Sequence, residues 1–298
     1  MKTAIITSAD SKYYPLLCEL LASIKRHPQS ADMTIGIINA GLTDQQVETL
    51  KSQNHLVVDG IWPIPLSKRR LKGRDFLKAC ISRPFIPELF PSFDFYIWLD
   101  ADTWVQDWSA IDLLLAGAKK TGLAVVPQVD RAYGKTMRIS WFGPIPYRPR
   151  SFYYSNARKA FDFKTARLLF PYPTINAGVF AMAGNAPHWK RWQELIRKAL
   201  KKGNVFTAEQ LTMGMMIYLE NYPAERLPAP CNWLCDTKPL YDPTQHRFIE
   251  PYLPHQPLGI LHLSGYDSMR SDKSVLTDIT FTDGTVHQMS LRYREAAQ

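Results

Sequence analysis

The sequence predicts a single α/β domain with a mainly parallel sheet covered by helices on both faces. The 298 residues are 46% hydrophobic, which is enough to bury a full core. The first hundred residues alternate short apolar segments with helix-like ones, the pattern of βαβ units. The segment 93–99, "FDFYIWL", is almost continuously apolar, as expected for a central strand buried on both faces.

The first half supplies the elements of this sheet in order. Apolar runs predict strands at 3–8, 33–39, 55–60 and 93–99, and apolar residues at helical spacing predict helices at 13–27 and 42–53. Thr43 and Gln46 have the spacing of a capping box at the start of the second helix.

The second half has a different pattern. It predicts strands at 122–129, 174–182 and 258–265, helices at 188–203 and 206–220, and a terminal hairpin at 280–291 that turns at Asp283-Gly284. Between these, 131–173 is rich in Arg, Tyr and Pro, has weak periodicity and is predicted to be irregular. Its aromatic residues are either packed or offer stacking surfaces to an acceptor sugar: Tyr133, Trp141, Phe142, Tyr147, Tyr153 and Tyr154. No linker is apparent, so we expect one domain over 1–298, with halves at 1–105 and 106–265 and an extension at 266–298.

The net charge of +9 invites a nucleic-acid or membrane interpretation, but the placement of the charge matters more. Much of it lies on the amphipathic helix 188–203, where a solvated outer face is the plain interpretation and contact with acidic lipids the alternative. We expect no nucleic-acid partner. The four cysteines are scattered, which favours buried thiols over a disulfide framework or a zinc site. A cytoplasmic protein is expected, with a peripheral position at the inner face of the membrane as the alternative.

Two carboxylates, Asp100 and Asp102, follow the apolar strand. A chain with 18 aspartates is expected to contain about one Asp-x-Asp pair by chance, so only the surrounding sequence can support a functional interpretation of this pair. Ligands of open α/β sheets bind beyond the carboxyl ends of the strands, and like charges at such an end need a cation to offset them. Oxygen ligands favour Mg²⁺ or Mn²⁺. The alternative is a solvated strand end with Asp102 capping a turn.

Five segments occur in an order that resembles the retaining glycosyltransferases of family eight, the group that contains glycogenin and bacterial lipopolysaccharide galactosyltransferases. These are "YIWLDADTWV", "INAGVFAM", "FTAEQLTMGMMIY", "LPAPCNWLC" and "ILHLSG". The resemblance implies a GT-A fold and transfer of a sugar from a nucleotide donor, usually a UDP-sugar. It also implies a metal ion, Mn²⁺ with Mg²⁺ as the alternative, held by Asp100, Asp102 and His262.

The resemblance further implies a set of donor-binding residues, each of which has an ordinary structural alternative. They are Asp10 and Tyr13 for the uridine, Arg83 for the diphosphate or sugar, Asn176, Gly178 and Asp130 for the sugar, and Gly265 of the His-x-x-Gly segment. Asp10 is equally suited to cap the first helix, and Tyr13 to pack.

Glu209 and Gln210 stand where the resemblance places residues beside the anomeric carbon. The alternative is structural, because Thr207 and Gln210 also have capping-box spacing and Glu209 suits a helix N-terminus. Neither is a convincing nucleophile, so attack by the acceptor from the same face and a covalent intermediate both stay open.

One position departs from the family pattern. Ser268 stands where a lysine that contacts the diphosphate is expected, and either Arg270 or Lys273 is expected to supply the charge instead.

The sequence therefore predicts a metal-dependent hexosyltransferase that acts with retention on a saccharide, glycolipid or protein acceptor. Two alternatives remain. One is a sugar-nucleotide-utilising nucleotidyltransferase, although "TSADSKYY" lacks the glycines of a phosphate loop. The other is a non-catalytic basic binding protein with a degenerate donor site.

Overall fold

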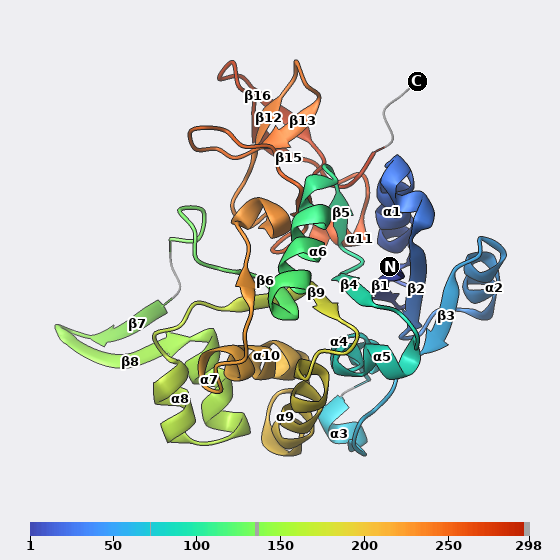
Figure 1. The fold of residues 1–298 in the computed structure, drawn as a ribbon. Helices are drawn as coiled ribbons and strands as arrows, with labels where there is room; N and C mark the ends of the chain where they lie inside the picture. Colours follow the sequence, from blue (N-terminus) through green and yellow to red (C-terminus); the bar gives the residue numbers. More distant parts are fainter. Residues whose placement is uncertain (72, 135–136, 295–298) are drawn as a thin grey trace.

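The computed structural model describes residues 1–71, 73–134 and 137–294. A seven-stranded sheet forms its centre (Figure 1). In sheet order the strands are β10 (Glu225–Arg226), β6 (Leu123–Pro127), β9 (Ile175–Ala183), β4 (Phe95–Leu99), β1 (Thr3–Ala9), β2 (Thr34–Asn39) and β3 (Leu56–Asp59). The pairs β1–β2, β1–β4, β2–β3 and β6–β10 are parallel, and β9 runs antiparallel to β4 and β6. The mainly parallel sheet is confirmed.

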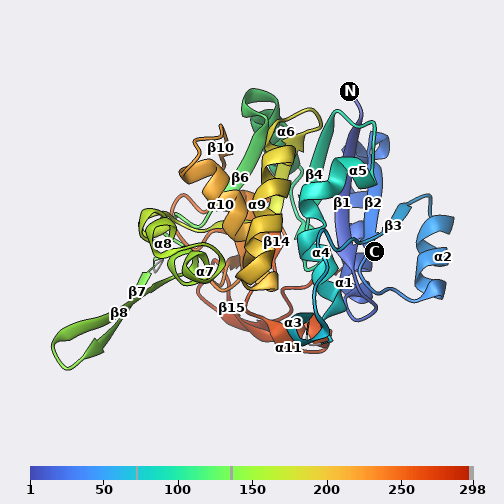
Figure 2. The same cartoon turned by 90° about the horizontal axis from the view of Figure 1, so that it is seen from below.

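Helices cover both faces of this sheet (Figure 2). They are α1 (Tyr14–Lys25), α2 (Asp44–Ser52), α3 (Lys68–Leu71), α4 (Lys78–Ile81), α5 (Ile86–Leu89), α6 (Ser109–Thr121), α7 (Phe152–Ala160), α8 (Phe163–Leu169), α9 (His188–Lys202), α10 (Ala208–Tyr218) and α11 (Asp267–Ser271). Alternation along β1 assigns the faces, because Ala4 and Ile6 pack in a core with α9 and α10, whereas Ile5 packs in a core with α1 and α6. Both faces of the central strands are therefore buried.

The helices predicted from periodicity form where expected. Thr43 and Gln46 make both bonds of the capping box at the start of α2. The apolar residues of α9 point into the core, and the helix ends at Gly203. Its exposed outer face carries lysines: Lys190, Lys198, Lys201 and Lys202.

The prediction of an irregular region at 131–173 is wrong. The chain there forms a two-stranded hairpin, β7 (Met137–Phe142) and β8 (Ile145–Ser151), followed by α7 and α8. In Figure 2 the hairpin extends away from the rest of the molecule. The periodicity of the sequence did not reveal the hairpin, because strands with no buried face have no alternation of apolar and polar residues. In addition, prolines at 144, 146 and 149 are unusual in a strand and made β8 hard to predict.

Further short strands outside the central sheet, all but β5 from the C-terminal part, form three small sheets. They are β5 (Thr103–Val105), β11 (Trp233–Leu234), β12 (Leu240–Asp242), β13 (Arg247–Ile249), β14 (Ile260–His262), β15 (Thr277–Thr280) and β16 (Val286–Met289). The predicted hairpin around Asp283-Gly284 is confirmed as β15–β16. Strand β14 runs antiparallel to β5 and pairs His262 with Thr103, which brings the late histidine beside the end of β4.

Two further observations concern the chain as a whole. Within the described residues, no helix has both the length and the apolar run needed to cross a membrane. Cys231 and Cys235 are buried free thiols as expected, whereas Cys18 is an exposed one.

Candidate functional site

A cavity of about 810 Å³ opens at the carboxyl ends of β1, β2 and β4. Its walls come from the loop after β1, the start of β9, the first turn of α10, and the segment that runs from β14 into α11. The predicted residues that line it are Asp10, Tyr13, Arg83, Asp100, Asp102, Asn176, Gly178, Glu209, Gln210, His262, Gly265 and Arg270. Residues distant in sequence therefore converge where ligands of such sheets bind.

Asp100, Asp102 and His262 form a cluster in this cavity. One possible ligand atom from each lies within 4.8 Å of the others. Two ligands of one ion with bonds of about 2.1 Å lie at most about 4.2 Å apart, so a small side-chain movement brings all three onto one ion. Gly178 makes room for the cluster, because a Cβ there would lie 2.5 Å from His262 Cε1 and 2.7 Å from Asp100 Oδ2. Two oxygens and an imidazole nitrogen are a donor set that fits a divalent cation.

Arg83 holds Asp100 from beneath, at what we call the floor of the cavity. Its Nη2 donates to Asp100 Oδ1 at 2.5 Å, and its Nη1 donates to Glu209 Oε1 at 3.3 Å and to the Ala177 carbonyl at 3.0 Å. The indole of Trp98 donates to the same Asp100 oxygen at 2.8 Å. These bonds occupy Oδ1, and Oδ2 is the Asp100 oxygen that lies toward Gly178.

Arg270 pairs with Asp102, at what we call the rim of the cavity. Its Nη1 donates to Asp102 Oδ2 at 2.7 Å, and its Nη2 pairs with Asp267 of the same helix. Lys273, the other candidate for the missing cation, does not line the cavity and pairs instead with Glu19 at 3.4 Å. Ser268 is exposed on α11. Of the two candidates, Arg270 alone lies in the cavity.

His262 is oriented by a residue that sequence reasoning did not single out. Its Nδ1 lies 3.0 Å from Asn232 Oδ1, and the Asn232 amide donates to Asn176 Oδ1 at 3.1 Å. The Asn232 oxygen is thus the acceptor, which leaves His262 Nε2 to face Asp102 Oδ1 at 3.5 Å. A hydrogen bond of this kind on the other ring nitrogen commonly orients a metal-binding histidine. Asn232 lies in "LPAPCNWLC", but only the fold reveals its contact.

The electrostatics of the cluster differ between its members. Burial raises the pKa of Asp100, although the charge of Arg83 opposes this. Burial also acts to raise the pKa of Asp102, but the charges of His262 and Arg270 outweigh it and hold that pKa below its ordinary value. Asp102 therefore carries the firmer negative charge.

The loop after β1 brings Asp10 and Tyr13 to the cavity. Asp10 Oδ1 accepts hydrogen bonds from the backbone N–H of Lys12 at 3.1 Å and of Tyr13 at 2.9 Å, which fixes the turn before α1. Tyr13 is partly exposed at the rim, and burial together with the charge of Asp102 raises its pKa to about 12. The tyrosine is therefore a neutral ring at physiological pH.

Asn176 and Gly265 also lie at the cavity, whereas Asp130 does not line it. Asn176 Oδ1 accepts from the Gly178 N–H at 2.8 Å, and Gly265 adopts a φ of +81° that glycine tolerates best. Asp130 accepts from the Ala132 N–H at 2.9 Å and stabilises its own turn.

The capping box considered as the structural alternative at the start of α10 does not form. The Thr207 hydroxyl donates to Asn156 at 2.8 Å and makes no cap bond. Burial raises the pKa of Glu209 to about 7, against the charge of Arg83. Gln210 lines the cavity, and its Oε1 accepts a 3.4 Å bond from the Ala177 N–H.

The six aromatic residues singled out in 131–173 fall into two groups, and none of them lines the cavity, although Phe152 of the same segment does. Tyr153 is fully buried, and Tyr133 and Tyr154 pack against neighbouring rings. Trp141, Phe142 and Tyr147 are exposed on the β7–β8 hairpin. The packing interpretation is right for the first group and wrong for the second.

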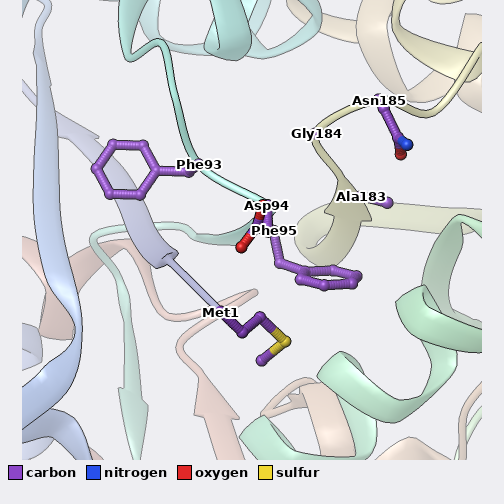
Figure 3. A pocket seen from close by; sticks show the side chains of 7 residues that line it. All are labelled: Met1, Phe93, Asp94, Phe95, Ala183, Gly184 and Asn185. Carbon is purple, nitrogen blue, oxygen red and sulfur yellow. The ribbon is translucent and has the colours of Figure 1, made fainter.

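A second, shallower hollow of about 480 Å³ lies at the opposite end of the sheet (Figure 3). Met1, Phe95 and Ala183 are among its lining residues, and its one carboxylate, Asp94, accepts a hydrogen bond from the Lys2 N–H at 2.8 Å. This hollow holds no cluster of reactive groups.

Comparison with known proteins bears on the fold. No known family profile and no curated protein sequence matches the chain. The apo structure of the bifunctional glycosyltransferase WbbM is similar, with a TM-score of 0.54 and 15% identity over 89% of this chain and 46% of WbbM. The galactosyltransferase LgtC with donor and acceptor sugar analogs gives 0.49 and 15% over 88% and 87%, and the glycosyltransferase GlyE of Streptococcus pneumoniae gives 0.48 and 18% over 90% and 55%. The similarity to WbbM and the sheet topology confirm the predicted GT-A type of fold.

Proposed function

We propose that this protein is a glycosyltransferase that moves a hexosyl group from a nucleotide sugar, a UDP-sugar by preference, to an acceptor hydroxyl with retention at the anomeric carbon. The observation that carries the proposal is the convergence of Asp100, Asp102 and His262 in a cavity at the carboxyl ends of the strands. The fold supports it, because WbbM shares that fold at a modest identity.

The ligands of the metal ion would be Asp100, Asp102 and His262. An imidazole in the set favours Mn²⁺ over Mg²⁺. When bound, the ion supplies a positive charge that stabilises the departing diphosphate. The hydrogen bonds of Arg83 with Asp100 and of Asn232 with His262 support this role, because they fix the orientation of the carboxylate and of the imidazole.

Arg270 is proposed as the cation for the diphosphate, in place of the lysine that Ser268 replaces. Its side chain is 21% exposed, so it can leave Asp102 when a metal ion takes that carboxylate. Guanidinium binds phosphate oxygens in a two-pronged fork. The nucleoside would lie along Asp10 and Tyr13, whose neutral ring suits stacking on uracil.

Gln210 and Glu209 are proposed to have separate tasks. Gln210 lies on the cavity wall and would face the sugar together with Asn176. Glu209 is 4% exposed and bonded to Arg83, so it acts as a positioning residue for the floor rather than as a nucleophile. Attack by the acceptor hydroxyl on the same face of the sugar, without a covalent enzyme intermediate, fits this arrangement. Asp130 has no proposed role, because it does not line the cavity.

Calorimetry with UDP and several UDP-sugars, with and without Mn²⁺, tests the proposal. We expect binding that depends on Mn²⁺ and that is lost in Asp102→Ala, with Lys273→Ala as the control that retains it. Absence of metal-dependent binding to every nucleotide sugar would overturn the proposal, and binding to nucleic acid alone would favour the non-catalytic alternative. Product analysis then separates sugar transfer from nucleotidyl transfer, since only the former releases UDP.

A further inference from the structure

The β7–β8 hairpin exposes a set of large apolar side chains that belong to none of the apolar clusters formed by the described residues. Their exposed fractions are 47% for Met137, 48% for Ile139, 60% for Trp141, 76% for Phe142, 62% for Ile145 and 71% for Tyr147. Both cartoon views show the hairpin reaching out from the body of the protein (Figures 1 and 2). A contiguous exposed apolar surface of this kind marks an interaction site.

The hairpin has two chemically different faces and an apolar tip. Met137 and Ile139 alternate with Arg138 along β7 and therefore share one face, and the pairing shifts register between Ser140 and Trp141 nearer the tip. Arg138 lies on the other face, directly opposite Arg150 of β8. The tip turns through Gly143 between the paired residues Phe142 and Ile145.

The facing arginines indicate an anionic partner. Like charges directly opposite each other destabilise a strand pair, and within the described residues neither arginine is in an ion pair. An anion between Arg138 and Arg150 would remove the repulsion. The net charge of +9 adds a general attraction toward an anionic surface.

The spacing of these groups matches a lipid interface. Phe142 lies four positions after Arg138 in the sequence, which corresponds to about 13 Å along a strand. Apolar groups of interfacial elements enter the headgroup and acyl boundary by about 5–10 Å. A tip inserted to that depth leaves the arginines among the phosphates, and Trp141 and Tyr147 at the level that such side chains favour.

A second copy of this chain fits the hairpin less well. Strand addition at the edge of β8 lacks backbone N–H groups at Pro146 and Pro149, and two copies that each carry a net charge of +9 repel each other. Helix α9 is also a weaker candidate for membrane contact, because its apolar face is buried and its outer face offers only charge. We propose that the β7–β8 hairpin docks this protein on a bilayer that contains anionic lipids, with the tip inserted and Arg138 and Arg150 on the phosphates.

Vesicle flotation of the full chain tests this proposal. Phosphatidylcholine vesicles are compared with vesicles that also contain phosphatidylglycerol, for the wild type and for the double variant Trp141→Ser/Phe142→Ser. We expect binding to the anionic vesicles only, and a loss of about ten-fold or more in the variant. Arg138→Gln/Arg150→Gln should bind more weakly and depend less on phosphatidylglycerol.

Two controls make the outcome decisive. Leu253→Ser removes a side chain that is 75% exposed elsewhere and should bind as the wild type does. Lys198→Gln/Lys201→Gln tests the outer face of α9 and should change binding little. An unchanged unfolding midpoint shows that each variant is folded. The proposal is overturned if the wild type ignores anionic vesicles, if the tip variant binds as well as the wild type, if the α9 variant alone abolishes binding, or if the tip variant only converts a dimer to a monomer. None of these measurements needs a nucleotide sugar, so failure here is separate from failure of the proposed activity.

Discussion

The floor and the rim of the cavity each pair an arginine with one aspartate of the Asp-x-Asp pair, but the two arginines differ in exposure and in their other partners. At the floor, Arg83 has a side chain that is 6% exposed and serves Asp100, Glu209 and a backbone carbonyl at once. At the rim, Arg270 has a side chain that is 21% exposed, belongs to a five-residue helix and serves Asp102.

This difference in exposure and in partners indicates that Arg83 mainly stabilises the site and that Arg270 is free to respond to a ligand. A buried cation that satisfies two carboxylates cannot leave without exposing uncompensated charge to a low-dielectric interior. Moving a partly exposed cation away from its partner costs less free energy, because water can solvate the charges that are separated. We therefore expect the floor to set the stability of the site, and the rim to respond to ligands.

The largest expected effect is on the floor. In Arg83→Met, Asp100 and Glu209 lose their shared buried cation, so the free energy of unfolding should fall by about 3–5 kcal/mol. Urea denaturation at neutral pH measures this. Arg270→Met is the matched variant at the rim, and an equal loss in the two variants would contradict the comparison.

The pH dependence of stability tests the floor without removing its cation. Glu209 has a pKa of about 7 in the folded protein against an ordinary value of 4.5, because burial favours its neutral form. A raised pKa gives stability that is fully present below pH 4.5 and lost as the pH rises through 7. The loss is on the order of 3 kcal/mol.

Glu209→Gln should flatten this part of the stability profile. The raised pKa of Asp100 contributes a slope of the same sign, and the lowered pKa values of His27, His55 and His188 contribute slopes of the opposite sign, so the difference between the two profiles isolates Glu209. Urea midpoints measured between about pH 5 and pH 8 check the expectation. Equal slopes for the wild type and Glu209→Gln over this range would contradict the titration of Glu209 in the folded protein.

Sequence reasoning reached the floor and the rim to different extents. The grouping of Asp100, Asp102 and His262 was implied by a family resemblance, whereas the sheet that assembles them was predicted from apolar runs that a buried parallel strand requires. The choice between Arg270 and Lys273 was left open, because it depends on which way a short helix turns. Asn232 was missed since its role lies in a contact with His262, and contacts between distant segments leave no local pattern. The hairpin was missed for the opposite reason, because within the described residues none of its apolar side chains joins a core cluster that could impose a pattern.

Gly178 tests the space between floor and rim. In Gly178→Ala the new Cβ would lie 2.5 Å from His262 Cε1 and 2.7 Å from Asp100 Oδ2, so both must shift. We expect a loss of about 1–3 kcal/mol in unfolding free energy, together with loss of Mn²⁺ binding in calorimetry. Gly134→Ala is the matched control, because a Cβ there meets nothing within 4 Å. Full Mn²⁺ binding by the Gly178 variant would mean that the metal site lies elsewhere.

The smallest change in stability, and the most specific change in binding, is expected at the rim. Arg270→Gln removes a partly exposed pair, so the free energy of unfolding should fall by no more than about 1 kcal/mol. The variant should bind Mn²⁺ alone more tightly, because a competing cation has left Asp102, and should bind UDP in the presence of Mn²⁺ about ten-fold more weakly, because a charged donor to the diphosphate is gone. Lys273→Gln should change neither affinity, since Lys273 pairs with Glu19 outside the cavity. Calorimetry on the two variants measures both affinities. Effects of the same sign on Mn²⁺ binding and on UDP binding would mean that Arg270 only positions Asp102, as Arg83 positions Asp100.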